Sequence, residues 1–257
     1  MTRGPADHDD ATGYARLVRR AAARFRPAGR TPYHFARGKL GADPVFAALL
    51  RQGLLAHRTR VLDLGCGQGV LEVLLATLED PRAASDWPAE WPRPPCGLRV
   101  HALDLRAKAV RAANVALDGL PAAARYRVET GDLRTMPVDP VDAVVILDVL
   151  HYLAHAEQER VIARCARALE PGGRLLLRVG DAARGWRFRW TLANDALITL
   201  VRGAWPRFAT RSADQWAALL ARHGFVVRTQ PMSEGTSFAN VLLVGERPPE
   251  RGLSRTR

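Results

Sequence analysis

The sequence predicts an α/β fold in which helices cover both faces of a mostly parallel, doubly wound sheet. The first observation is an apolar run, Val61–Leu64, followed by three glycines at alternate positions and then by the apolar helical run Val70–Leu78. This order is typical of a strand, a tight turn and a helix start. The second observation is that strand-like and helix-like runs continue to alternate along the rest of the chain.

The apolar patterns predict seven strands and the helices between them. The strands are expected over residues 61–64, 98–105, 125–129, 140–147, 174–179, 225–229 and 241–245, with the last two antiparallel. Helices are expected over residues 11–25, 43–55, 70–78, 106–117, 157–169, 191–202 and 212–223. Asp43 before Pro44, and Ser212, are good helix caps. The proline-rich segment 77–96 should lie at the amino ends of the strands, so its tryptophans are expected to pack locally.

Composition limits the partners and the compartment. The chain has 257 residues, 47% of them hydrophobic, which is enough for one sizeable core. No apolar run approaches 18 residues, so no transmembrane helix is expected, although peripheral membrane contact remains compatible with the sequence. The start of the chain lacks the apolar region of a signal peptide. The three cysteines have no metal-binding spacing, so we expect no metal site and a cytoplasmic protein.

The strong positive charge is weak evidence for a nucleic-acid partner. The formal net charge is +12, but only Lys39 and Lys108 are lysines, so 38 − 2 = 36 of the basic residues are arginines. Arginine in place of lysine, with abundant alanine, glycine and proline, indicates a GC-rich coding bias that raises charge everywhere rather than in one patch. Nucleic acid is therefore an unfavoured partner.

The glycine-rich turn carries the first functional prediction. Asp63 precedes Gly65, Gly67 and Gly69, and Val70 stands where a dinucleotide-binding G-x-G-x-x-G turn would need its third glycine. The segment D-L-G-C-G-Q-G closely resembles the first motif of class I S-adenosylmethionine (SAM)-dependent methyltransferases. The resemblance covers about residues 60–245 and implies SAM as the cofactor. It also implies a Rossmann-like seven-stranded sheet with an antiparallel last strand. The alternative is a glycine turn that binds nothing.

The resemblance implies cofactor contacts at the carboxyl ends of successive strands. Asp104 is expected to bind the ribose hydroxyls, and Asp132 with Leu133 to contact the adenine. In the segment before the first strand, Arg37 or Lys39 would pair with the SAM carboxylate, or else this segment simply packs. The full set expected to bind the cofactor is Arg37, Asp63, Gly65, Cys66, Gly67, Gly69, Asp104, Leu105, Asp132, Leu133 and Leu147.

The substrate side of the site is predicted from the fourth and fifth strands. His151 is the leading candidate for a general base because imidazole titrates near neutral pH, and Asp148 and Asp181 are reserves. A base is needed only if the acceptor must lose a proton, and His151 is otherwise expected to face the cofactor or pack on Tyr152. Residues 180–208 alternate aromatics with arginines and are expected to form a lid. The alternatives are a packed segment or a surface that stacks RNA.

These predictions give a domain scheme and a function. Residues 1–56 are expected to form a helical cover over the cofactor site, 57–246 the methyltransferase domain with its lid, and 247–257 a disordered tail. We expect methyl transfer to a small-molecule or acyl-carrier-bound acceptor. An RNA methyltransferase or a non-catalytic SAM-binding protein is the alternative, and the absence of an N-P-P-[YF] segment after the fourth strand disfavours DNA and translation-factor targets.

Three further segments narrow the resemblance. They are Asp-Val-Leu-His-Tyr-Leu, Arg-Val-Gly-Asp-Ala-Ala and Pro-Met-Ser-Glu-Gly-Thr. They look like methyltransferases associated with aryl polyene-type lipid biosynthesis, which would imply an aromatic or polyene lipid precursor as acceptor. The methyl group would then go to a carbon of an aromatic head group, beside a hydroxyl. The sequence leaves the oligomeric state open.

Overall fold

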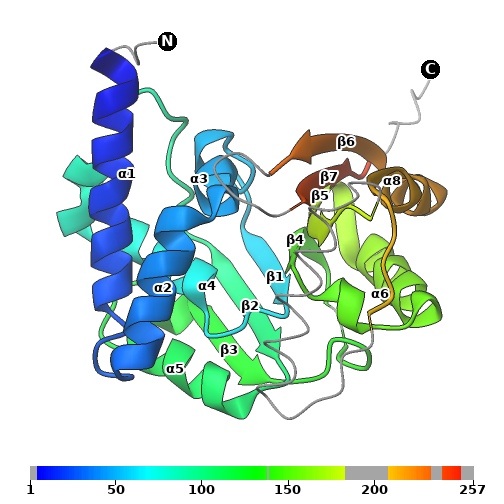
Figure 1. Cartoon of the computed structure of the whole chain (residues 1–257), viewed down its shortest axis with the longest axis horizontal. Helices are drawn as coiled ribbons and strands as arrows, with labels where there is room; N and C mark the ends of the chain where they lie inside the picture. Colours follow the sequence, from blue (N-terminus) through cyan, green and yellow to red (C-terminus); the bar gives the residue numbers. More distant parts are fainter. Residues whose placement is uncertain (1–4, 138, 183–207, 233–238, 250–257) are drawn as a thin grey trace, which may run out of the picture. The chain divides into compact units, whose positions relative to one another are not determined.

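The computed structural model describes residues 5–137, 139–182, 208–232 and 239–249, with side chains from residue 13 onward. Its strands form one seven-stranded sheet in the order β3-β2-β1-β4-β5-β7-β6 (Figure 1). The strands are β1 (Arg60–Leu64), β2 (Arg99–Asp104), β3 (Tyr126–Thr130), β4 (Val141–Leu147), β5 (Leu169–Gly180), β6 (Val226–Pro231) and β7 (Asn240–Glu246). Strand β7 runs antiparallel to both β5 and β6. The predicted fold class is therefore confirmed.

The helices follow the predicted alternation. They are α1 (Pro5–Ala23), α2 (Arg30–Ala42), α3 (Pro44–Arg51), α4 (Val70–Leu78), α5 (Ala107–Leu117), α6 (His155–Ala168) and α8 (Ala213–Arg222). Short 3₁₀ turns are η1 (Pro81–Asp86), η2 (Ala123–Arg125) and η3 (Leu150–Tyr152). No helix within the described ranges is both long and apolar enough to cross a membrane.

The chain divides into two compact units. Unit 1 comprises Met1–Met136 with Met232–Ser237, and unit 2 comprises Pro137–Pro231 with Phe238–Arg257. The N-terminal helices α1–α3 thus belong to the same unit as β1–β3, whereas the sequence predicted a boundary at residue 56. The functional domain scheme remains a prediction. The expected lid falls mainly on residues 183–207, and most of the expected tail on 250–257, both outside the described residues.

Unit 1 is built on a parallel three-stranded part of the sheet. Val61 pairs with Val100, and Val100 pairs with Tyr126. The strands are short apolar runs because helices cover both faces of a parallel sheet. Helix α4 is buried at all nine of its residues, in agreement with its uniformly apolar sequence. Helix α5 is joined to β3 by Asn114, whose Nδ2 donates to the carbonyl of Val128 at 3.0 Å.

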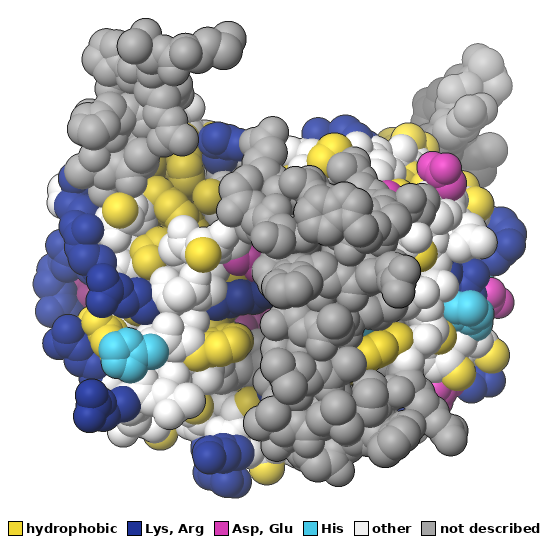
Figure 2. Space-filling view, viewed as in Figure 1, with side chains coloured by type: hydrophobic (Ala, Val, Ile, Leu, Met, Phe, Trp, Pro, Cys, Tyr) yellow, Lys and Arg dark blue, Asp and Glu magenta, His cyan; other side chains and the backbone are white. Residues whose placement is uncertain are grey.

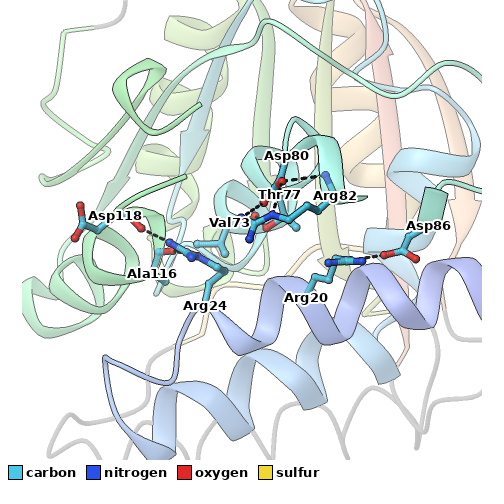
Figure 3. Close-up of polar contacts among 9 residues, drawn as sticks. All are labelled: Arg20, Arg24, Val73, Thr77, Asp80, Arg82, Asp86, Ala116 and Asp118. Atoms are coloured by element: carbon cyan, nitrogen blue, oxygen red, sulfur yellow. Dashed lines mark hydrogen bonds and ion pairs between the residues drawn. The ribbon is translucent and has the colours of Figure 1, made fainter. Parts of the chain in front are cut away.

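Arginines attach helix α1 to the rest of unit 1 (Figure 3). Arg20 forms an ion pair with the buried carboxylate of Asp86, which also accepts a hydrogen bond from Arg16 at 2.7 Å. Arg24 donates to the carbonyl oxygens of Ala116 and Asp118 near the end of α5. Part of the basic charge of the chain therefore has a structural role. Figure 2 shows Lys and Arg side chains gathered along the edge where Figure 1 places α1.

The N-terminal region differs from the prediction in one element. Residues 30–42 form helix α2, whereas the sequence predicted no helix between residues 25 and 43. Pro32 lies in the first turn, where its missing N–H costs no intrahelical hydrogen bond. The predicted cap of the next helix is confirmed, because Asp43 accepts the Val45 N–H at 3.2 Å and Pro44 is the first helical residue. The tryptophans of segment 77–96 pack locally, with the rings of Trp87 and Trp91 5.5 Å apart.

Unit 2 contains β4–β7 and helices α6 and α8. Strand β5 begins at Leu169, five residues earlier than predicted, because the Pro171-Gly172-Gly173 segment is part of an irregular ladder rather than a separate turn. Strand β7 is buried along six of its seven residues, and β6 is largely exposed. Helix α8 begins with a reciprocal capping box between Ser212 and Gln215.

Candidate functional site

The glycine turn after β1 has the backbone that its sequence predicts. Gly65, Gly67 and Gly69 have φ of 87°, 65° and 70°, which L side chains rarely adopt. The N–H groups of Gly65 and Cys66 both donate to the carbonyl of Leu103, at 2.8 and 3.0 Å, which fixes the turn against β2. The turn therefore lies across the carboxyl ends of β1 and β2.

Gly69 has a second reason to be glycine. A Cβ there would lie 2.5 Å from the Cβ of Ala113, so α4 and α5 approach each other at this point. At Gly67 a Cβ would lie 3.3 Å from Nη2 of Arg106 instead. The contact at Gly69 is therefore part of the packing of α4 on α5, whereas the contact at Gly67 places the guanidinium group of Arg106 directly beside the turn.

Beneath the turn lie two buried carboxyl groups, those of Asp63 and Glu72. Asp63 is 3% exposed and Glu72 is fully buried. Burial and the neighbouring Glu72 raise the pKa of Asp63 well above its usual range, and burial also raises the pKa of Glu72. Among the described residues, Oδ1 of Asp63 and both carboxyl oxygens of Glu72 accept no hydrogen bond from outside the pair, and the two carboxyl groups interact with each other. Such buried acceptors suit a cationic or hydrogen-donating ligand.

Asp104 ends β2 with a buried carboxylate that is 7% exposed. Its Oδ2 accepts the N–H of Gly67 at 2.9 Å, so the carboxylate and the glycine turn are joined. The same carboxylate accepts the backbone N–H and the guanidinium of Arg106, with Nε to Oδ1 at 2.9 Å and Nη2 to Oδ2 at 3.2 Å. Asp104 thus lies at the position predicted for a ribose-binding carboxylate, and the guanidinium group of Arg106 is hydrogen-bonded to it.

Asp132 repeats the arrangement one strand further. Its carboxylate accepts the backbone N–H of Arg134 at 2.8 Å and the Nη2 of the same residue at 2.7 Å. Leu133 beside it is buried at 7% exposure, whereas Leu105 after Asp104 is 62% exposed. An exposed leucine beside a polar strand end is a suitable surface for an aromatic base.

Other predicted cofactor residues lie around the turn. Burial, followed by Glu72 and Asp63, raises the pKa of the Cys66 thiol, which therefore stays protonated. Gln68 donates through Nε2 to the carbonyl of Pro32 at 3.0 Å, so α2 contacts the glycine turn. Arg37 is exposed on α2, and Lys39 forms an ion pair with Asp43 at 2.6 Å. Arg37 interacts with the side chain of Tyr33 and is the more exposed of the two cations.

In unit 2, His151 lies in η3 after β4 and belongs to a small aromatic cluster. Its ring lies 4.1 Å from that of Tyr152 and 5.7 Å from that of Phe208, measured between centroids. Burial lowers the pKa of His151, and Asp148 opposes that shift. The imidazole is consequently neutral at neutral pH, which is the form a general base requires.

The two reserve bases have structural partners. Asp148 has a φ of 58° and forms a two-bond ion pair with the buried Arg178, with Nε to Oδ1 at 2.7 Å and Nη2 to Oδ2 at 2.5 Å. Asp181 is 7% exposed and accepts the N–H of Ala213 at 3.0 Å, at the start of α8. These contacts favour His151 over both as the base. Leu147, at the end of β4, is half-buried.

A separate cavity of about 570 Å³ lies at the carboxyl ends of α6 and α8. It is lined by Arg167, Arg222, His223 and Arg247 among others. Arg247 donates to the carbonyls of Ala166 and Leu169, and cations at helix carboxyl ends complement the helix dipole. Helix capping therefore accounts for its charge. Among the described residues, no cluster of three His, Cys, Asp or Glu side chains is arranged to hold a metal.

Sequence reasoning missed three polar residues of unit 1. Glu72 was hidden in an apolar helical run, where its only signal was a carboxyl group in the first turn after a glycine loop. Arg106 and Arg134 had a clearer signal, because the tripeptide Asp-Leu-Arg occurs at the ends of both β2 and β3. A repeated tripeptide at equivalent strand ends indicates a shared local geometry.

Comparison with known proteins places this geometry in context. Residues 62–175 match a family model described as a methyltransferase domain. A ubiquinone biosynthesis O-methyltransferase of Xanthomonas oryzae pv. oryzae is 33% identical over 121 residues, which cover 46% of this chain and 41% of the relative. A protein of the same description from Xylella fastidiosa is 30% identical over 138 residues, covering 52% and 47%. The matched region thus spans less than half the length of these curated relatives.

Solved structures share the fold at low identity. An O-methyltransferase family protein from Burkholderia thailandensis has a TM-score of 0.61 and 21% identity, over 88% of this chain and 62% of that chain. The magnesium protoporphyrin IX methyltransferase of Synechocystis PCC 6803, solved with bound S-adenosylhomocysteine (SAH), has a TM-score of 0.55 and 22% identity, over 88% and 93%. These likenesses agree with the Rossmann-like sheet observed here.

Proposed function

We propose that this class I SAM-dependent methyltransferase domain transfers a methyl group from SAM to a hydroxyl oxygen of a small-molecule acceptor. One observation carries the proposal. Within the segment that matches the family model, a glycine turn, a buried carboxyl pair and two strand-end carboxylates gather in unit 1. The relatives named O-methyltransferases favour oxygen as the methylated atom.

In this proposal, different residues of unit 1 bind different parts of the cofactor. Gly65, Gly67 and Gly69 have no side chains, so the backbone can approach the ligand at these positions. Asp63 with Glu72 offers the ammonium group buried oxygens that lack a donor. Asp104 binds the ribose hydroxyls, and Asp132 with Leu105 and Leu133 holds the adenine. Arg37 pairs with the ligand carboxylate. When bound, SAM supplies an electrophilic methyl group on a sulfonium.

The residues of unit 2 serve the acceptor. Methyl transfer is an in-line displacement, so positioning supplies much of the rate. A hydroxyl acceptor must also lose its proton, and the neutral imidazole of His151 takes it as the oxygen bonds to carbon and the bond from carbon to sulfur breaks. Tyr152 and Phe208 present aromatic faces beside the imidazole, which suits an aromatic acceptor.

A narrower form of the proposal is a carrier-bound or polyene-lipid acceptor. The Asp148–Leu153 segment that favours this form includes Asp148, held by Arg178, and two members of the aromatic cluster, His151 and Tyr152. An RNA acceptor is disfavoured because Arg16, Arg20 and Arg24 of the basic α1 make contacts within unit 1.

The test has two parts. Isothermal titration of SAH into the folded protein should give micromolar binding, and its absence for both SAM and SAH would refute the proposal. Radiolabelled SAM with a panel of hydroxylated aromatic compounds should then give labelled methyl ethers, by transfer of the methyl group to a hydroxyl oxygen. Binding without transfer to any small acceptor or carrier-bound acyl chain would favour the non-catalytic alternative.

A further inference from the structure

The carboxylate expected to hold the ribose accepts four hydrogen bonds within the protein. Oδ1 of Asp104 accepts from the backbone N–H and Nε of Arg106, both at 2.9 Å. Oδ2 accepts from Gly67 at 2.9 Å and from Nη2 of Arg106 at 3.2 Å. A carboxylate offers about four lone-pair sites, so the acceptor capacity of Asp104 is filled.

The Arg106 guanidinium also takes space beside the glycine turn. Its Nη2 lies 3.3 Å from the point where a Cβ of Gly67 would stand. The side chain of Arg106 is 46% exposed, so nothing encloses it there. A ligand that lies over the turn and donates two hydroxyl hydrogen bonds to Asp104 competes with the guanidinium group of Arg106 in two ways. It needs the acceptor sites on Asp104 that the guanidinium uses, and it needs the space that the guanidinium fills.

We propose that Arg106 is the residue that sets the affinity of this site for ribose, because it competes with the ribose hydroxyls for Asp104. This inference rests on the proposed cofactor site and adds to it a residue that acts against binding. Binding of the ribose requires the two guanidinium hydrogen bonds to break, while the backbone N–H bonds from Gly67 and Arg106 remain. Arg134 stands in the same relation to Asp132 and to the adenine.

Unit 1 contains a matched control for the same local geometry. Arg82 donates to Asp80 through its backbone N–H and Nε, both to Oδ1 at 3.0 Å, and through Nη2 to Oδ2 at 2.8 Å (Figure 3). This Asp-x-Arg pair lies in η1, before β2, and touches neither the glycine turn nor Asp104. Arg82→Ala removes the same kind of ion pair without reaching the site.

The experiment measures SAH affinity by isothermal titration for the parent, Arg106→Ala and Arg82→Ala. Since exposed ion pairs contribute little, Arg106→Ala should bind SAH about two- to fivefold more tightly, and Arg82→Ala should match the parent. Added salt should weaken binding by the parent less than binding by Arg106→Ala, because in the parent it also screens the competing ion pair between Arg106 and Asp104. In an Asp104→Ala background, Arg106→Ala should have no further effect.

The outcomes separate this inference from the proposed function. If the parent and Arg106→Ala both bind SAH and the variant binds equally or more weakly, Arg106 does not compete with the ligand. That result overturns this inference and leaves the proposed cofactor site standing. If neither folded protein binds SAH, the proposed function fails and the inference with it. Binding by Arg106→Ala alone would support both.

Discussion

Carboxylates end strands in both units, but their partners differ. In unit 1, Asp104 is held by Gly67 of the turn and by Arg106, two residues along the chain. In unit 2, Asp148 pairs with Arg178 and Asp181 accepts from Ala213, 30 and 32 residues away. Gly67 joins Asp104 to the turn across 37 residues of chain, but the guanidinium of Arg106 can leave without loosening the fold. In unit 2, Arg178 and Ala213 each join a carboxylate to a separate element. The same residue type at equivalent strand ends is therefore available to a ligand in one unit and committed to the fold in the other.

The largest effect is expected on turnover and at His151, the side chain of unit 2 to which we assign the role of general base. His151→Ala should lower turnover about 10²–10⁴-fold and leave SAH affinity nearly unchanged, because a positioned base contributes that much. Tyr152→Phe keeps the adjoining ring and should retain turnover. Normal turnover in His151→Ala would show that the imidazole is structural, and loss of SAH binding would assign it to the cofactor pocket instead.

The pH profile sharpens this assignment. The base is the neutral imidazole, and burial lowers the pKa of His151. Turnover should therefore be constant at and above neutral pH and should fall only below about 6.5, the ordinary histidine pKa. The acid limb should disappear in His151→Ala. An acid limb centred above pH 7 would contradict a buried, neutral histidine.

The next largest effect should separate the two kinds of carboxylate by stability. Asp148→Ala leaves the guanidinium of Arg178 buried without its carboxylate, which should cost about 3 kcal/mol of unfolding free energy. Asp104→Ala should cost less, about 1–2 kcal/mol, because it removes the acceptor of the Gly67 N–H and an ion pair to an Arg106 side chain that is 46% exposed. Urea denaturation followed by circular dichroism measures both. Equal losses would mean that the two carboxylates serve the fold alike.

Replacing Asp104 should affect ligand affinity more than replacing Asp148, which is the opposite of the order expected for stability. Asp104→Ala removes the acceptor of the ribose hydroxyls and should weaken SAH binding by about 1–3 kcal/mol. Calorimetry at several temperatures gives the affinity directly. Glu129→Ala is a useful control because its carboxylate lies on the neighbouring strand β3 and pairs with His101. An unchanged affinity in Asp104→Ala would show that another group binds the ribose.

The smallest effect concerns the buried carboxyl pair. The pKa of Glu72 is raised in the folded protein, so its carboxyl favours folding below the unfolded-state pKa and loses that contribution as pH rises through the folded-state value. Glu72→Gln should therefore raise stability at pH 8 by about 1 kcal/mol, with less gain at pH 5. Melting curves at both pH values test this. A variant less stable at pH 8 would mean that the carboxylate has a partner.

The sequence predicted the elements whose signal is local. Helix α4 was predicted with its exact bounds, since its apolar run begins directly after the last glycine of the turn. Helix α2 was missed because Pro32, Gly38 and clustered aromatics lower its intrinsic helix propensity, and packing against α1 and α4 replaces it. Strand β5 was shortened because Pro171-Gly172-Gly173 resembles a turn, while its pairing with β4 is set by residues far along the chain.

The residues of the candidate site were likewise predictable only where their signal is local. The glycine turn, Asp104 and Asp132 were identified because motif spacing and strand ends locate them. The buried state of Glu72 and the attachment of Asp148 to Arg178 depend on tertiary neighbours that no local pattern contains. Ranking three candidate bases therefore required the structure.

The scarcity of lysine provides a way to observe the site. Lys39 and Lys108 are the only lysines, and Lys39 pairs with Asp43 at 2.6 Å. Lys108 is exposed in the first turn of α5, two residues after Arg106. Once the α-amino group is blocked, an amine-reactive fluorophore used at limiting dose should label Lys108 in preference to Lys39. The dye would then stand beside Asp104, where its emission could report ligand binding in a single-label titration, without any engineered cysteine.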